Sequence, residues 1–397
     1  MFFIVRLFIY KKESFPICLL TSSKTKVKAD SFTLYSQHAE HHTFACMQTD
    51  VLIVGQGISG TLLSWFLETE GVNYLLIDED NPHTSSKTAA GIINPVTGRR
   101  FVTTWMIEDL MAFAKTSYTA LSKALGQNFI TNKSIIDFFP SEQMRQSFVK
   151  RVEEQNCYLH SFPDQNYFNT YFNYNYGCGE INPVYMVDLS SILTLWRERV
   201  KENIITETFS INNLEVNGNG ITYKDIRAEK IIFCDGLASA TNPWFKLLPF
   251  SANKGEALII ECDDLPQAYV YKKSVAIVPL QEQNHYWVGS NYQWEFHDAN
   301  PSEAFYRQFT AGLNEWLKIK YKVLDHKAAV RPATLERRPF VGFHPLFPAI
   351  GILNGLGTKG ASLAPYFAHQ LAQNIVHGLP IADEANVHRF SKLLSKQ

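Results

Sequence analysis

The chain has 397 residues, of which 46% are hydrophobic and 19% are charged, a balance typical of a globular protein large enough for two domains. Its 37 basic residues nearly cancel its 38 acidic ones, which argues against a broad basic face for nucleic acid or an anionic membrane. The apolar runs fall short of the roughly 20 residues that span a bilayer. We therefore expect a cytoplasmic protein without a membrane partner.

Residues 1–46 form an N-terminal extension that differs from the rest of the chain. Met1 to Tyr10 is apolar, but the pair Lys11-Lys12 follows this run, whereas a secretory signal has its positive charge first and a small-residue cleavage site after it. The sequence indicates that residues 1–46 are disordered, or that they follow an upstream start codon chosen in error, with Met47 as the true start. A targeting peptide is the alternative.

The next segment has the pattern of a nucleotide-binding βαβ unit. Val51 to Val54 is a short apolar run typical of a strand buried on both faces of a parallel sheet. A helix is predicted from Ile58 to Glu70, with a glycine stop signal after it, and a second strand from Tyr74 to Ile77. Between the first strand and the helix lies the turn Gly55-Gln56-Gly57-Ile58-Ser59-Gly60.

Each position of this turn has a physical reason. Gly55 permits the tight turn, Gly57 lets the backbone approach a pyrophosphate, and Gly60 lets the helix pack closely on the strand. Ile58 and Ser59 open the helix, whose N-terminal N–H groups favour phosphate. Asp78, at the end of the second strand, is placed to accept hydrogen bonds from ribose hydroxyls. This unit predicts a dinucleotide site but does not choose between FAD and NAD.

Three later segments alternate in the manner of strands, and we expect them to form an antiparallel sheet: Ala257 to Glu261, Ser274 to Leu280 and His285 to Tyr292. The chain ends with another strand, Ala349 to Leu353, a glycine-rich loop, Asn354 to Gly360, and a helix, Ala361 to His377. A plain turn capped by glycines is the alternative for this loop. The six cysteines lack C-x-x-C or histidine-cluster spacing, so we expect reduced thiols and no metal site.

Together, the two glycine-rich units resemble the FAD-dependent oxidoreductases of the D-amino-acid oxidase family, which includes glycine and sarcosine oxidases. The resemblance implies an α/β fold, with a glutathione-reductase-type, Rossmann-like FAD-binding domain and a smaller substrate domain whose sheet is mainly antiparallel. It places residues 47–100, 181–250 and 331–390 in the FAD-binding domain. Residues 101–180 and 251–330 belong to the substrate domain.

The resemblance also implies which residues bind FAD. The last loop and its helix face the flavin, and the positive end of that helix stabilises the negative charge of the reduced ring. The small-residue loop from Ser85 to Pro95 passes over the flavin, and a strand ending near Ser239 closes the nucleotide domain. In that strand Asp235 departs from the family's Ala or Thr, which leaves Gly236 carried over, while Phe209 is either an adenine contact or strand packing. The cofactor residues implied are Ser86, Lys87, Ala90, Gly91, Gly236, Gly355, Gly357, Thr358, Lys359 and Gly360.

The substrate contact implied by the resemblance is Arg331, in the motif Val-Arg-Pro-Ala-Thr. The fork of a guanidinium suits bidentate binding of a substrate carboxylate, although an interdomain ion pair is the alternative. Tyr292 and Arg99 are further candidates. The implied reaction oxidises a C–N bond of an amino acid or secondary amine by hydride transfer to flavin N5, giving an imine that hydrolyses. FAD is expected to be noncovalent, because the segment from Pro339 to Pro345 lacks an obvious attachment residue other than His344. Oxygen or a carrier is expected as electron acceptor.

Other functions remain open on the sequence. An NAD-dependent dehydrogenase would explain the first glycine turn but not the second, and a non-catalytic FAD-binding protein would have both. The loop Gly-Leu-Gly-Thr-Lys-Gly and the stretch Ala-Gly-Ile-Ile-Asn-Pro also resemble the FAD-dependent half of the bifunctional bacterial enzyme that modifies the tRNA wobble uridine. A net charge of −1 offers no broad tRNA-binding face, so tRNA is a possible but not the favoured substrate.

Overall fold

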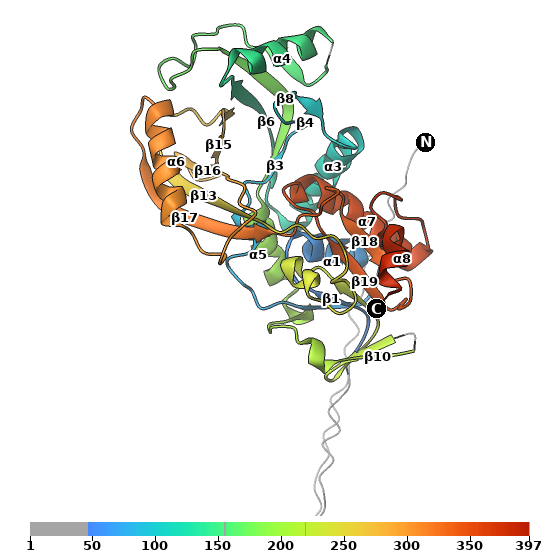
Figure 1. The fold of residues 1–397 in the computed structure, drawn as a ribbon. Coiled ribbons are helices and arrows are strands. Elements are labelled where there is room, and N and C mark those ends of the chain that lie inside the picture. The colour runs from blue at the N-terminus through green and yellow to red at the C-terminus, as the bar shows by residue number, and fades with distance from the viewer. Residues whose placement is uncertain (1–46, 155, 219, 397) are drawn as a thin grey trace, which may run out of the picture. The chain divides into compact units, whose positions relative to one another are not determined.

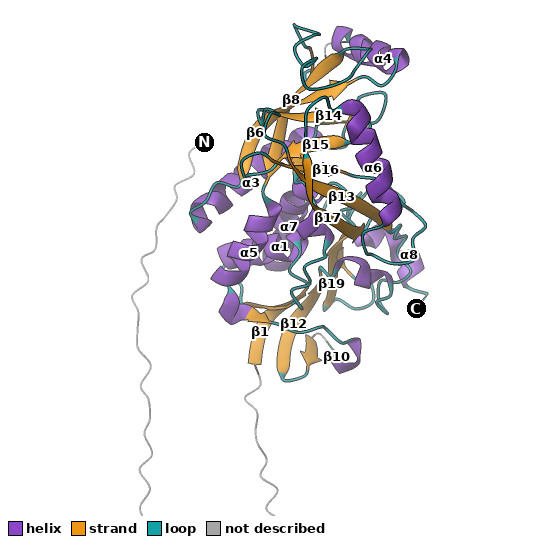
Figure 2. Ribbon diagram, turned by 90° about the vertical axis from the view of Figure 1, so that its left-hand side faces the viewer, coloured by secondary structure: helices purple, strands orange, loops and turns teal. Residues whose placement is uncertain are grey.

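The computed structural model describes residues 47–154, 156–218 and 220–396, so the expectations for residues 1–46 lie outside the described residues. The described chain folds around two large mixed sheets (Figures 1 and 2), and the predicted α/β fold class is confirmed. None of the described helices has the length and apolar character that a membrane-spanning helix needs.

The first sheet has eight strands within the described residues, with a parallel centre. Strand β1 pairs in parallel with β2 on one side and with β12 on the other. The first residues of β12 pair with the hairpin β10–β11, and its last residues pair with β19. The strands are β1 (Met47–Val54), β2 (Tyr74–Ile77), β9 (Ile204–Ile205), β10 (Leu214–Asn217), β11 (Gly220–Tyr223), β12 (Ile226–Phe233), β18 (Phe340–Phe343) and β19 (Ile350–Asn354).

The central strand is buried on both faces, as its continuous apolar run predicts. Val51 and Ile53 belong to one core cluster with four helices, whereas Leu52 and Val54 belong to a second cluster on the opposite face, because successive side chains of a strand alternate. The four helices are α1 (Ile58–Thr69), α3 (Ile107–Leu125), α5 (Leu189–Arg199) and α7 (Gly360–His377). Helices α1 and α7 lie side by side and carry the two glycine-rich loops at their starts.

The second sheet has nine strands within the described residues and is antiparallel except where β14 pairs with β6. Its order is β17 (Lys322–Arg331), β13 (Asn253–Glu261), β16 (His285–Gly289), β15 (Ala276–Pro279), β14 (Tyr269–Lys272), β6 (Ile130–Phe138), β8 (Cys178–Val187) and β3 (Ile92–Ile93), with β7 (Leu159–Ser161) paired to β8. Helix α6 (Glu303–Trp316) packs on one face, where Phe305 and Trp316 join Leu258 and Tyr271 in one core cluster.

Shorter elements connect these layers. They are the helices α2 (Ser85–Thr88), α4 (Glu142–Glu153) and α8 (Ser391–Leu394), the hairpin β4 (Val96–Thr97) and β5 (Val102–Thr103), and the 3-10 turns η1 (Lys201–Asn203), η2 (Ile211–Asn213), η3 (Gly236–Ala240) and η4 (Val387–Phe390). Figure 1 shows α4 at the far end of the second sheet and β10 at the opposite end of the molecule.

Several expected boundaries change in the structure. Strands β3 and β8 belong to the second sheet, so sheet membership does not follow the expected limits at residues 100 and 180. Helix α3 packs with α7 in the core of the first sheet, although its residues were expected in the substrate domain. The strand predicted to reach Tyr292 ends at Gly289, because the side chain of Asn291 accepts the Glu256 N–H at 2.8 Å and replaces the ladder.

Candidate functional site

A single cavity of about 790 Å³ brings together segments that are far apart in the sequence. Both glycine-rich loops, the small-residue loop after β2 and strands of the second sheet line it. Most of the residues predicted from the sequence are in its wall: Gly55, Gly57, Ile58, Ser59, Asp78, Ser86, Ala90, Gly91, Gly236, Tyr292, Arg331, Gly357, Thr358, Lys359 and Gly360. Phe209 also lines it, whereas Arg99 does not.

Three of the predicted cofactor residues lie outside the cavity wall. A Cβ at Gly60 would lie 1.9 Å from the carbonyl oxygen of Gly55, so this glycine serves the packing of α1 on the loop. Gly355 has a φ of +76°, and a Cβ there would lie 2.6 Å from the Thr334 methyl group. The ammonium group of Lys87 instead forms an ion pair with Asp80 at 2.6 Å.

The first glycine turn is shaped by its backbone. Gly55 has a φ of +94°, and a Cβ there would lie 2.7 Å from the carbonyl oxygen of Cys234, so only glycine is accommodated. At Gly57, the hydroxyl of Ser86 would lie 3.1 Å from an added Cβ, and the same hydroxyl accepts the N–H of Ile58. The turn therefore presents backbone rather than side chains to the cavity.

The two helices that follow the glycine-rich loops, α1 and α7, have N-termini that their N-cap residues do not cap. Neither α1 nor α7 has a side-chain cap or an acidic residue in its first turn. By contrast, α4, α5 and α6 are capped by Ser141, Asp188 and Ser302. An uncapped N-terminus presents N–H donors and about half a positive charge. Both ends of the cavity are thus suited to negatively charged groups of a ligand.

Asp78 is held by a residue that the sequence interpretation missed. Its carboxylate accepts the N–H groups of Gln56 and Asp80, each at 2.8 Å, and a guanidinium N–H of Arg197 at 3.0 Å. A carboxylate has about four acceptor positions, so one is left for a hydroxyl of a ligand. Arg197 lies on α5, more than a hundred residues from Asp78 in sequence, and no local pattern indicates this pairing.

Asp235 is the centre of a polar cluster in the cavity wall. The hydroxyl of Ser239 donates to its carboxylate, and the amide of Asn354 donates to Ser239 Oγ at 2.9 Å and to the carbonyl of Gly236 at 2.7 Å. Burial raises the pKa of Asp235 to about 6, although the Ser239 hydrogen bond opposes the shift. This aspartate therefore ties the end of β12 to the second glycine-rich loop.

Arg331 lies at the end of β17 with its guanidinium group in the cavity wall. It donates to Asn253 Oδ1 and Ser290 Oγ, both at 2.7 Å, and lies 5.0 Å from the ring of Tyr292. Among the described residues it has no carboxylate partner, since these acceptors are neutral. Burial lowers the pKa of Arg331 from its usual value, but arginine stays charged at neutral pH. The side chain is a half-buried cation for which the described part of the chain supplies no counterion.

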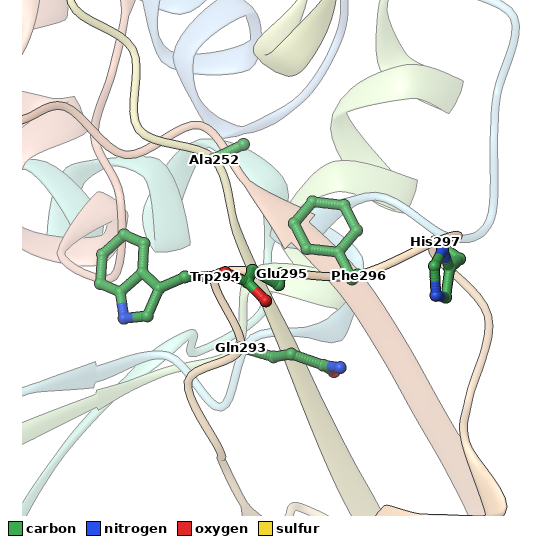
Figure 3. Close-up of a pocket in the computed structure, with 6 residues that line it drawn as sticks. All are labelled: Ala252, Gln293, Trp294, Glu295, Phe296 and His297. Carbon is green, nitrogen blue, oxygen red and sulfur yellow. The ribbon is translucent and has the colours of Figure 1, made fainter.

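A second hollow lies beside this site, on the segment that follows β16 (Figure 3). Trp294 and His297 lie at opposite ends of the group of side chains drawn there, and Trp294 is 60% exposed. The residues do not converge on a common point, and none of them is in the wall of the large cavity.

Within the described residues, no group of three His, Cys, Asp or Glu side chains is arranged to hold a metal ion. Cys157 is exposed, Cys178, Cys234 and Cys262 are buried, and these four thiols are free of disulfide bonds.

Comparison with known proteins agrees with this geometry. Residues 50–374 match the family model described as FAD dependent oxidoreductase (DAO). A glycine oxidase of Pseudomonas aeruginosa is 22% identical over an alignment of 369 residues that covers 85% of this chain and 98% of that protein. The crystal structure of glycine oxidase from Geobacillus kaustophilus superposes with a TM-score of 0.73 at 16% identity, covering 85% of this chain and 96% of the other. Iminodiacetate oxidase from Chelativorans sp. BNC1 gives 0.68 at 18% identity, covering 85% and 98%. The family match spans both glycine-rich loops and the strands between them, and the chain therefore belongs to the DAO family of FAD-dependent oxidoreductases.

Proposed function

We propose that this enzyme uses FAD to oxidise the C–N bond of an amino acid or secondary amine that carries a carboxylate. The observation that supports the carboxylate is Arg331, a half-buried cation in the cavity wall whose acceptors in the described chain are all neutral. Desolvating a cation without a counterion is unfavourable, and a carboxylate ligand would compensate it. The relatives named as glycine and iminodiacetate oxidases support the same substrate class.

The cavity fits FAD on the features of this chain. The Gly57 backbone and the start of α1 would hold the pyrophosphate, and the remaining acceptor position of Asp78 would hold a ribose hydroxyl. The loop from Gly357 to Gly360 and the start of α7 would hold the flavin. When bound, FAD supplies the two-electron chemistry by accepting hydride at N5, so the substrate leaves as an imine that hydrolyses.

The residues of the chain contribute position and charge. Arg331 would bind the substrate carboxylate through two parallel N–H donors, which fixes the α-carbon relative to the flavin. The positive end of α7 and the ammonium group of Lys359 favour negative charge on the reduced ring. Burial, together with Arg337 and Arg338, lowers the pKa of Lys359.

The attachment of FAD is proposed to be noncovalent. His344, the candidate attachment residue, is 1% exposed and packs against Phe245 and Phe347. It is not in the wall of the cavity. The ring therefore lies in a core rather than facing a ligand.

The test is to purify the protein and mix it anaerobically with glycine, sarcosine, iminodiacetate and a set of D-amino acids. We expect a yellow protein whose flavin absorbance near 450 nm is bleached by at least one member of this set. A colourless protein that binds NAD would support the dehydrogenase alternative. A yellow protein that no amine bleaches would contradict the proposal, and bleaching only by carboxymethylaminomethyl-modified tRNA would support the tRNA alternative. Reoxidation by air or only by a carrier dye then identifies the electron acceptor.

A further inference from the structure

Lys272 is a cation in the cavity wall that the carboxylate-binding role of Arg331 does not explain. It ends β14, and its ammonium group lies 2.5 Å from Oδ2 of Asp137 on the neighbouring strand β6. The Lys272 side chain is 30% exposed, whereas Asp137 is fully buried. Lys272 lines the cavity, and Asp137 does not.

A purely structural role for the ion pair with Asp137 does not explain why Lys272 lies in the cavity wall. A buried ion pair contributes little net stability compared with apolar side chains, because both charges are desolvated. An ammonium group has three N–H donors, and the hydrogen bond to Asp137 uses one of them. No second acceptor for Lys272 lies among the described residues. Burial raises the pKa of Asp137 even though Lys272 opposes the shift.

The sheet register places Lys272 and Arg331 on one face. Lys272 pairs with Ala276, Ala276 with Gly289, and Gly289 with Ala257, so these residues form one row. The strands that carry them, β14, β15, β16 and β13, are neighbours in the second sheet (Figure 2). Paired residues project to the same face, as do residues two apart along a strand. Gly255 is therefore on this face too. The opposite face is covered by α6.

The guanidinium group of Arg331 lies over Gly255. A Cβ at Gly255 would lie 1.7 Å from Nη2 of Arg331, so the arginine is seated on that glycine. Between this point and Lys272 the row consists of small residues, Ala257, Gly289 and Ala276, and all of them line the cavity. The edge of the Trp287 indole lies over the middle of this row, because a Cβ at Gly289 would be 2.9 Å from its Cη2. A ligand that reaches from the Arg331 end to Lys272 would therefore pass along the Trp287 ring, which also lines the cavity.

The length of this floor excludes a very small substrate from touching both ends. Three strand spacings separate Ala257 from Lys272, and at roughly 4.8 Å each this gives about 14 Å between their Cα atoms. A ligand with the size of glycine would reach only the Arg331 end. Contact with Lys272 requires a chain that extends from the amine along the row.

We propose that Lys272, oriented by Asp137, is a second substrate contact that donates a hydrogen bond to an oxygen acceptor at the far end of the substrate. The substrate class is accordingly an N-substituted glycine or long-chain amino acid that ends in a carbonyl, carboxamide or carboxylate oxygen. This inference rests on the proposed function, because it takes the Arg331 end as the carboxylate site.

The test measures the apparent affinity of each ligand, under anaerobic conditions, from the ligand concentration that gives half of the flavin spectral change, whether that change is a shift or bleaching. The ligands are glycine and N-alkylglycines of increasing length that end in a methyl, carboxamide or carboxylate group. At one chain length, we expect the wild-type protein to bind an oxygen-terminated ligand at least about tenfold more tightly than the methyl-terminated ligand of equal length. The carboxamide and carboxylate series show which acceptor is preferred.

Variants assign the preference to the side chain. Lys272→Met should abolish the preference without changing the affinity for glycine, and Lys272→Arg should retain part of it. The matched control is Lys273→Met, because Lys273 follows Lys272 directly and is not in the cavity wall. Melting temperature and flavin content report whether each variant folds. If Lys272→Met is unstable, Asp137→Asn, which disturbs the orientation of the ammonium group, should weaken the same preference.

The outcomes separate this inference from the proposed function. If glycine and the N-alkylglycines bind with equal affinity whatever their terminal group, Lys272 is not a substrate contact. A change in reoxidation rate in Lys272→Met, with the terminal preference intact, would also overturn the inference and assign Lys272 to the cofactor side. The proposed function itself fails if no carboxylate ligand changes the flavin spectrum, so that no ligand binding can be assigned to Arg331.

Discussion

Replacing Gly255 by alanine would perturb the proposed carboxylate site without changing any charged residue. The added Cβ would lie 1.7 Å from Nη2, 2.1 Å from Cζ and 2.6 Å from Nη1 of Arg331. Because all three atoms belong to one rigid planar group, the guanidinium must move as a whole. It would then lose its hydrogen bonds to Ser290 and Asn253, both at 2.7 Å, and the alignment of its fork with a carboxylate.

The size of this effect follows from the contacts that are lost. A hydrogen bond involving a charged group contributes about 1.5–3 kcal/mol, so the loss of one aligned contact corresponds to roughly a 10- to 100-fold weaker affinity for a carboxylate ligand. The assay titrates glycolate, a glycine analogue without the amine, and follows the flavin difference spectrum. Flavin content should be unchanged, since the three atoms nearest the added Cβ all belong to Arg331 and none to a glycine-rich loop.

Two controls make this prediction specific. Gly312→Ala in α6 introduces the same atom where no heavy atom lies within 4 Å, and it should leave glycolate binding unchanged. In a variant that already carries Arg331→Ala, adding Gly255→Ala should not weaken glycolate binding further, because the two residues act through one contact. Unchanged glycolate affinity in Gly255→Ala would refute both the packing of the Arg331 guanidinium on this glycine and the role of Arg331 in binding the carboxylate.

Three further predictions concern the cofactor side. Arg197→Met should weaken FAD binding by roughly tenfold in titrations of the apoprotein, because Asp78 loses a charged hydrogen bond; equal affinity would show that Arg197 does not orient it. Gly60→Ala should lower the melting temperature and the flavin content, since its Cβ would collide with the Gly55 carbonyl oxygen; a stable, fully yellow variant would contradict that. In the folded state the pKa of Asp235 is raised to about 6 from 3.8, so the stability linked to its protonation is present at low pH and lost as pH rises through about 6. Asp235→Asn should therefore gain about 2 kcal/mol relative to wild type between pH 4 and pH 8. Denaturant unfolding measures this, and a pH-independent difference would refute the assignment.

The local sequence was sufficient for the elements that carry their own signals. The glycine turn after Val54 is recognisable because a strand, a turn and a helix follow one another within a few residues, and the structure has β1, α1 and β2 there. The predicted strand Tyr74 to Ile77 has the same limits in the structure. The family resemblance, the α/β fold and FAD as cofactor are confirmed. They could be predicted because the two glycine-rich loops at opposite ends of the chain are both short, local patterns.

The surroundings of the charged residues depend on tertiary structure. Arg331 is one residue in a recognisable motif, but its neutral acceptors and its seat on Gly255 exist only because β17 pairs with β13. Likewise, β14 must lie beside β6 before Lys272 can meet Asp137. Such pairings join residues that are tens to hundreds of positions apart, and strand register, which no local pattern encodes, decides which side chains share a face. The sequence therefore indicates the cofactor, whereas the packing of the second sheet against the two glycine-rich loops decides which charged side chains face the cavity.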